Sequence, residues 1–243
     1  MEVDRRSFVM GMAGSALLAL GAPRAALAKA WGGAPSGWTL FLGHSEAAPA
    51  FARGVRSVLA RAGCPEPGIV DAPGGPIAAH DALRAHVARA RGRRWIALVD
   101  DGGAALFQEL IRAASGWLLA RGSHACSRDA SVPLRHLWVA ASPTWSARTL
   151  LASSLMGTRS SFALTEQILG GTESTLPPAA VRNDTRLPGS ADWVECVGQA
   201  VAAAALGLGA AAAPAGDQRF VHRAARDEAR LPTWRLATFV ADL

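Results

Sequence analysis

Residues 94–99, with the sequence RWIALV, form the most strand-like stretch of the chain and decide its fold class. Asp100-Asp101-Gly102-Gly103 follows, and after it apolar residues recur on one helical face at Leu106, Phe107, Leu110 and Ile111. Another apolar run begins at Trp117. Residues 94–122 therefore predict a strand, a helix and a strand. Such a unit normally places its two strands side by side and parallel, with a right-handed crossover.

The same alternation extends along the chain. We expect further strands at residues 38–42, 69–70, 137–140, 161–169, 220–221 and 234–240, and helices at 51–62, 83–90, 146–155 and 191–206. Half of the residues are hydrophobic and 18% are charged, which is a globular composition. The sequence predicts an α/β fold, a single-domain layered α/β sandwich with a mixed, partly parallel sheet, over residues 29–243.

Residues 1–28 have the three parts of an export signal. Arg5 and Arg6 form a charged start, an apolar stretch runs from Phe8 to Ala22, and Ala26 and Ala28 give the small-x-small pattern of a cleavage site. Arg5-Arg6-Ser7-Phe8 resembles the twin-arginine signal. The resemblance implies that the twin-arginine translocase carries a folded passenger to the bacterial periplasm. An ordinary secretory signal and an uncleaved anchor are the alternatives.

Charge and hydropathy narrow the range of partners. The chain has a formal net charge of +6, and its densest basic run lies at residues 89–94. No aromatic residues interleave with these arginines, so we expect a solvated helix end and no nucleic-acid partner. Residues 196–216 carry no charge, but they are mostly alanine and glycine. We therefore expect a helix packed in the domain and no stable membrane span.

The three cysteines, Cys64, Cys126 and Cys196, are widely spaced, which argues against a redox pair, a zinc ribbon or covalent haem. One disulfide with one thiol, or three buried thiols, both fit this spacing. The six histidines form no pair with ligand spacing, so we expect no metal, and the cofactor is unknown. Four tryptophans at strand positions, Trp38, Trp95, Trp138 and Trp234, are expected in the core, with a sugar-stacking platform as the alternative.

Ligands of parallel sheets gather at the carboxyl ends of the strands, so residues that follow strands are the site candidates. His44, Ser45 and Glu46 follow the strand at 38–42, and Asp100, Asp101, Gly102 and Gly103 follow the strand at 94–99. We predict ligand binding by these residues. The structural alternative is that Ser45 and Asp101 cap the helices that follow them, with the glycines forming a tight turn.

Gly43-His44-Ser45-Glu46-Ala47 also resembles the GxSxG elbow of the α/β-hydrolases, although Ala47 stands where the pattern has its last glycine. The resemblance implies Ser45 as nucleophile, Asp100 or Asp101 as acid and His222 as base. Asp100 and Asp101 could instead hold a divalent metal.

Taken together, the sequence predicts an exported binding or accessory domain that takes a small ligand or an envelope protein as partner. A periplasmic hydrolase and a helper of a cofactor-loaded enzyme are the competing hypotheses. A loop at residues 170–190, rich in proline and glycine, has no assigned role.

Overall fold

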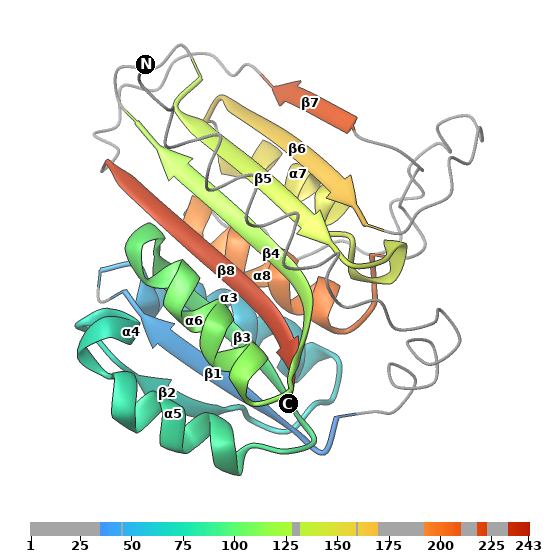
Figure 1. Cartoon of the computed structure of the whole chain (residues 1–243). Helices are drawn as coiled ribbons and strands as arrows, with labels where there is room; N and C mark the ends of the chain where they lie inside the picture. Colours follow the sequence, from blue (N-terminus) through green and yellow to red (C-terminus); the bar gives the residue numbers. More distant parts are fainter. Residues whose placement is uncertain are drawn as a thin grey trace. The chain divides into compact units, whose positions relative to one another are not determined.

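A mixed β-sheet organises the chain (Figure 1). The computed structural model describes residues 35–44, 46–127, 132–158, 160–169, 192–209, 218–222 and 233–243. The strands are β1 (Gly37–Gly43), β2 (Gly68–Asp71), β3 (Arg93–Asp100), β4 (Trp117–Cys126), β5 (Leu134–Ala140), β6 (Phe162–Ile168), β7 (Gln218–His222) and β8 (Trp234–Asp242). The helices are α3 (Ala48–Arg61), α4 (Gly75–Ala78), α5 (His80–Arg89), α6 (Asp101–Ala113), α7 (Arg148–Leu155) and α8 (Trp193–Ala205), with short 3₁₀ turns at Pro143–Trp145 and Met156–Thr158.

The strand order is β2-β1-β3-β8-β4-β5-β6-β7. The strand β1 is parallel to both β2 and β3, and β8 is antiparallel to both β3 and β4. Beyond β4, the pairing is antiparallel to β5, parallel from β5 to β6 and antiparallel from β6 to β7. The predicted α/β fold with a mixed, partly parallel sheet is confirmed.

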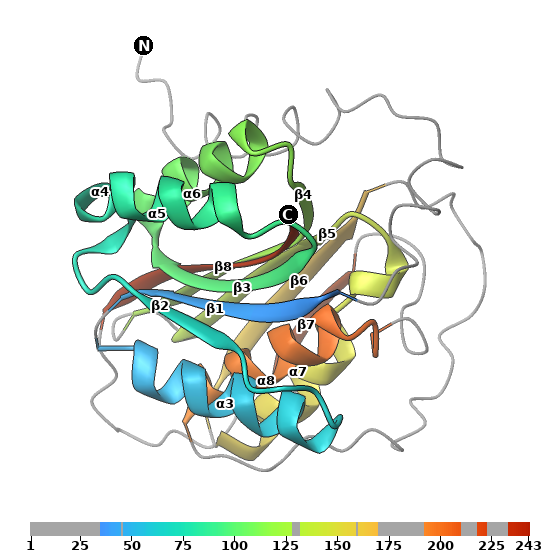
Figure 2. The ribbon, with the colours of Figure 1, turned by 90° about the horizontal axis from the view of Figure 1, so that it is seen from below.

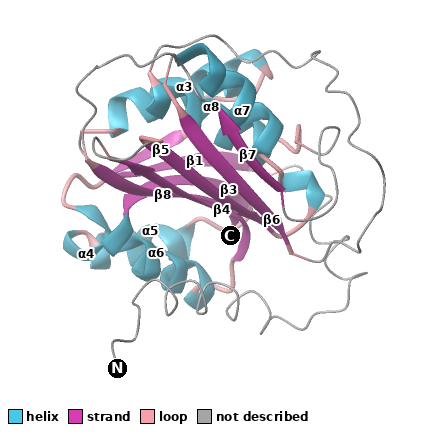
Figure 3. Cartoon of the chain, turned by 90° about the horizontal axis from the view of Figure 1, so that it is seen from above, coloured by secondary structure: helices cyan, strands magenta, loops and turns pink. Residues whose placement is uncertain are grey.

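Helices cover the sheet on two sides. Figures 2 and 3 show α3, α7 and α8 on one face and α4, α5 and α6 on the other. Parallel strands need this double cover because both of their faces are apolar. In β3, for example, every residue from Arg94 to Val99 is buried. The continuous apolar run at residues 94–99 is thus typical of a central strand that is covered on both faces.

One predicted strand pairing is wrong. Residues 94–122 do form a strand, a helix and a strand, namely β3, α6 and β4, and the two strands run in the same direction. They are not neighbours, however, because β8 lies between them and pairs with both. The local pattern predicts the direction of β4 correctly. The hydrogen-bonding edge of β3, however, is occupied by the apolar strand β8 instead of by β4.

The two apolar layers differ in how they are packed. On the α6 side, the ring of Phe107 lies 5.4 Å from that of Phe41 and 5.1 Å from that of Phe239, so large aromatic rings fill the space. On the other side, α3 and α8 approach so closely that a Cβ at Gly198 would collide with the carbonyl oxygen of Phe51. A Cβ at Gly54 would likewise collide with the Glu195 carbonyl oxygen. Small residues are what allow α8 to pack here, as expected for a helix buried in the domain.

The basic run at 89–94 is largely structural. Arg94 is 5% exposed, and its guanidinium donates two hydrogen bonds of 2.7 Å to the carboxylate of Asp242. Its third nitrogen donates to the carbonyl oxygen of Ala205 at the end of α8. Arg93 donates to the hydroxyl of Thr39 on β1. The expectation of a solvated helix end is therefore wrong for Arg93 and Arg94, which lie in β3, and it holds for Arg89, in the last turn of α5, and for the exposed Arg91 just after that helix.

Other expectations have mixed outcomes. Trp38, Trp95 and Trp138 are buried in the core, but Trp234 is only half-buried. Cys126 and Cys196 are buried, but Cys64 is partly exposed, so the expectation of three buried cysteines is wrong for Cys64. Within the described ranges, every helix is too short or too polar to span a lipid bilayer. The leader at 1–28 and the loop at 170–190 lie outside the described residues.

Candidate functional site

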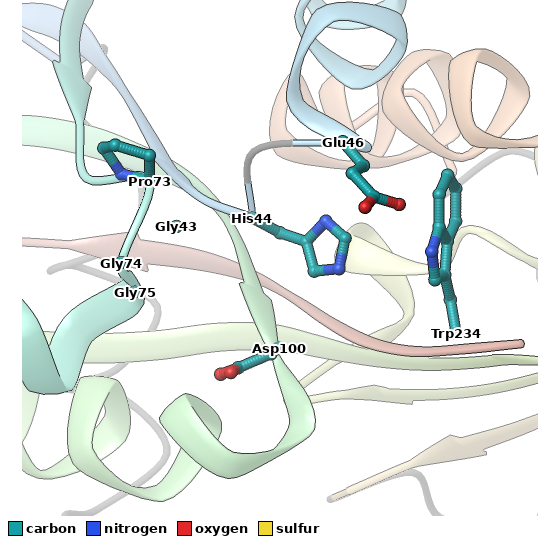
Figure 4. Close-up of a pocket in the computed structure, with 8 residues that line it drawn as sticks. All are labelled: Gly43, His44, Glu46, Pro73, Gly74, Gly75, Asp100 and Trp234. Atoms are coloured by element: carbon teal, nitrogen blue, oxygen red, sulfur yellow. The ribbon is translucent and has the colours of Figure 1, made fainter.

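A pocket of about 370 Å³ opens where β1 and β3 end (Figure 4). Its lining consists of Gly43, His44, Glu46, Pro73, Gly74, Gly75, Asp100 and Trp234. The connection from β1 to β2 passes over one face of the sheet through α3, and the connection from β2 to β3 passes over the other through α4 and α5. The pocket therefore lies at a topological switch point, where open α/β sheets bind their ligands.

His44 is held in one orientation by its neighbours. Its Nδ1 accepts a hydrogen bond of 3.2 Å from the backbone N–H of Ala47, at the start of α3. In the neutral imidazole the proton then lies on Nε2, because Nδ1 is already an acceptor. The ring packs edge-on against Trp234, with 5.5 Å between centroids and 66° between planes. His44 is thus an oriented polar group with one ring nitrogen left for a ligand.

Asp100 closes the other side of the pocket and caps a helix. Its carboxylate accepts a hydrogen bond of 2.6 Å from the N–H of Gly103, in the first turn of α6. Gly103 has no room for a side chain, since a Cβ there would lie 2.6 Å from Cδ of Pro76 and 2.7 Å from Oδ1 of Asp100. One carboxylate oxygen is therefore fixed by the helix, and the group still has lone pairs for a ligand.

The loop after β2 brings glycine backbone close to this carboxylate. Gly75 has a φ of +76°, a conformation that side chains other than glycine rarely adopt. A Cβ at Gly75 would lie 3.5 Å from the carbonyl oxygen of Gly43 and 4.0 Å from both carboxylate oxygens of Asp100. Glycine is thus favoured at this position by its backbone conformation, and its backbone lies close to the carboxylate of Asp100.

Glu46 and Trp234 form the opposite wall. Figure 4 shows the Glu46 side chain extending toward the indole of Trp234, whereas the Asp100 carboxylate points away from them, toward Gly75. Glu46 is exposed, and neither Glu46 nor Asp100 forms an ion pair with any residue that the structure describes. No lysine or arginine belongs to the lining named above. The described lining is accordingly acidic, with one aromatic platform.

The structure brings most of the predicted residues to one place. His44, Glu46 and Asp100 line the pocket, and Gly102 and Gly103 form the first turn of α6 beside it. Asp101 is exposed and lies outside the lining. The predicted cap at Asp101 is wrong, because the N-cap of α6 is Asp100.

Ser45 lies outside the described residues. The predicted N-cap position of α3 is nevertheless corrected, since Ala47 occupies it and the imidazole of His44 accepts from the Ala47 N–H.

Two parts of the pocket were missed by sequence reasoning. Trp234 was expected in the core, and its place beside the pocket follows only from the antiparallel direction of β8. Pro73, Gly74 and Gly75 were treated as part of a connecting loop. The pair Gly74-Gly75 directly after a strand is the signal that could have indicated a close backbone approach to a ligand.

Geometry disfavours the hydrolase arrangement. The strand β1 lies six strand spacings from β7, which is roughly 29 Å across the sheet, and His222 ends β7. His124, a second histidine that could be considered as a base, lies on β4 and is buried with both ring nitrogens in hydrogen bonds. A base on β7 or β4 would have to reach across neighbouring strands to serve a nucleophile after β1. Among the described residues, no group of three or more His, Cys, Asp or Glu side chains could hold a metal ion.

A second polar cluster lies inside the layer between the sheet and α8. Nδ1 of His124 and Nδ1 of His136 share a hydrogen bond of 2.9 Å, and Nε2 of His124 is 2.9 Å from the hydroxyl of Thr238. Burial lowers the pKa of His136 to about 3, and burial together with the neighbouring imidazole lowers the pKa of His124 as well. Both rings are therefore neutral at pH 7 and act as packing groups of the core.

No known protein family matches this sequence, and comparison with curated proteins and with solved structures finds no match either. The functional argument consequently depends on the geometry of the pocket.

Proposed function

We propose that this chain is an exported, periplasmic protein that binds a small polar ligand in the pocket at the ends of β1 and β3. One observation carries the proposal: His44 and Glu46 from the loop after β1, Asp100 from the end of β3 and Trp234 from the start of β8 line a single pocket of about 370 Å³. A cavity of this size suits a small molecule. Packing alone would not require two carboxylates and an oriented imidazole around it.

Binding is tested by nuclear magnetic resonance on the ¹⁵N-labelled chain. The probes are glucose, alanine, succinate and putrescine, added one at a time. We expect one of them to shift the amide signals of Gly43, Gly74 and Gly75 and the indole signal of Trp234. The variant Trp234→Ala should lose the response. The control variant Trp117→Ala should retain the response, because Trp117 pairs with Asp242, at the far end of β8 from Trp234. Shifts scattered over the surface, or none, would refute the proposed site.

Export is supported by the leader at 1–28 and is tested by fractionation. Replacement of Arg5 and Arg6 by lysine keeps the charge and removes the paired guanidinium groups, so it separates the twin-arginine route from ordinary secretion. We expect the double variant to stay unprocessed in the cytoplasm of a bacterial host, while the control Arg24→Lys reaches the periplasm. Equal export of both variants would contradict the twin-arginine route.

A further inference from the structure

We infer that the ligand of this pocket is a small organic cation with a primary ammonium group. The inference rests on the proposed function and adds the ligand's chemical class. The first support is charge. Glu46 and Asp100 have no ion-pair partner among the described residues, and the part of the lining that the structure describes contains no basic side chain other than His44. The chain as a whole has a formal net charge of +6, so an acidic pocket has the opposite sign of charge from the chain's net charge.

Helix dipoles must be weighed against these carboxylates. The amino ends of α3 and α6 lie beside the pocket, and each contributes roughly half a positive charge. Two carboxylates carry two negative charges, so the pocket keeps roughly one net negative charge while His44 is neutral. An anionic ligand would meet both carboxylates, and the dipoles are too weak to compensate for them. The sign of the field favours a cation.

The chemistry of the two carboxylates favours an ammonium group in particular. Glu46 and Asp100 both line the pocket, and a carboxylate accepts hydrogen bonds but donates none. An ammonium group has three donors and no acceptor, so it suits such groups. A neutral hydroxyl group would form weaker hydrogen bonds with them because it carries no charge.

Trp234 and Glu46 supply the second half of the pocket. The half-buried indole offers an apolar surface for methylene groups and attracts a cation through its ring face. Glu46 extends toward the same indole, on the far side of His44 from the Asp100 carboxylate. A ligand with a short carbon chain and an ammonium group at each end would engage both carboxylates at once.

Isothermal titration calorimetry on the full chain tests this inference with putrescine and its neutral isostere 1,4-butanediol. We expect putrescine to bind at least about tenfold more tightly, because each charge-assisted hydrogen bond contributes roughly a factor of ten. Binding should weaken severalfold when the ionic strength rises from about 0.02 M to 0.5 M, since exposed charge pairs are screened.

Variants locate the effect. Glu46→Gln removes one charge from an exposed side chain and should weaken putrescine binding about fivefold to tenfold. Asp100→Asn keeps an acceptor for the N–H of Gly103 and should weaken it similarly. The matched control is Asp81→Asn, which removes the same charge from the exposed face of α5 and should leave the affinity unchanged.

The outcomes separate the two proposals. If 1,4-butanediol or glucose binds as tightly as putrescine, without salt dependence, the pocket binds a ligand but not a cation, and this inference is overturned while the proposed function stands. Putrescine binding that Glu46→Gln leaves unchanged, or that Asp81→Asn weakens equally, also overturns it. If none of the probes shifts the pocket signals, both proposals fail.

Discussion

Two neighbouring glycines in the first turn of α6 should respond to the same substitution with opposite signs. A methyl group at Gly103 would lie 2.6 Å from Cδ of Pro76 and 2.7 Å from Oδ1 of Asp100, about 1 Å closer than ordinary contact. A methyl group at Gly102 would approach the Asp100 carboxylate only to 4.0 Å, which is an ordinary distance. The chain thus offers a matched pair of variants one residue apart.

The magnitudes follow from three effects. Overpacking against a proline ring costs about 1–3 kcal/mol, and displacing the capping carboxylate costs about 1 kcal/mol more. Replacing glycine by alanine in a helix returns up to about 1 kcal/mol. Gly103→Ala should therefore lower the free energy of unfolding by about 1–3 kcal/mol, whereas Gly102→Ala should raise it by up to about 1 kcal/mol.

Urea unfolding followed by circular dichroism measures both values. The same variants report on the site, because displacement of Asp100 changes the pocket wall. Gly103→Ala should also weaken putrescine binding, and Gly102→Ala should not. The reasoning is refuted if Gly103→Ala is as stable as the parent chain, since the pocket side of α6 would then have room that the structure does not show.

Three further predictions concern the core. Arg94→Leu leaves the carboxylate of Asp242 without its bidentate partner, so it should lower the free energy of unfolding by about 3–5 kcal/mol, measured by urea unfolding. A decrease of less than about 1 kcal/mol would contradict the ion pair's role in stability. The pKa of His136 is lowered to about 3, so its stabilising neutral form is fully present above pH 6.5 and stability is lost as pH falls from there toward 3, by about 1.4 kcal/mol per unit. His136→Leu should reduce this slope between pH 6.5 and 4.5, and an unchanged slope would count against the buried neutral ring. Gly198→Ala should push α8 away from Phe51 and cost at least about 1 kcal/mol, with Ala200→Gly as a control for helix propensity.

The sequence was sufficient for the strands, for all of the longer helices and for the layered α/β class, but the short helix α4 was not predicted. Apolar runs such as residues 94–99 and helical periodicity such as that of α6 are local signals, and they were interpreted correctly. Strand order was not accessible in the same way, because nothing within residues 94–122 shows that residues 234–242 pair on both sides. The pairing of His124 with His136 depends on the register of β4 with β5, which is likewise set by contacts between distant segments.

The candidate site shows the same division. His44, Glu46 and Asp100 could be selected because polar residues at the ends of parallel strands meet at one edge of a sheet. Trp234 could not, because its strand runs antiparallel and begins where the others end. A tryptophan that starts an apolar strand looks like a core residue until the direction and neighbours of that strand are known.

The central place of β8 has a consequence for how the chain acquires its structure. Within the described residues, the β2-β1-β3 group and the β4-β5-β6-β7 group are hydrogen-bonded to each other only through Trp234–Asp242. A nascent chain that has left the ribosome only as far as residue 233 holds two half-sheets with open, apolar inner edges, and such edges invite wrong pairing. The sheet can be completed only after the segment that joins the halves has been synthesised, so its assembly depends on contacts between residues far apart in the chain. Any cell that makes this chain must protect those edges from wrong pairing during that interval.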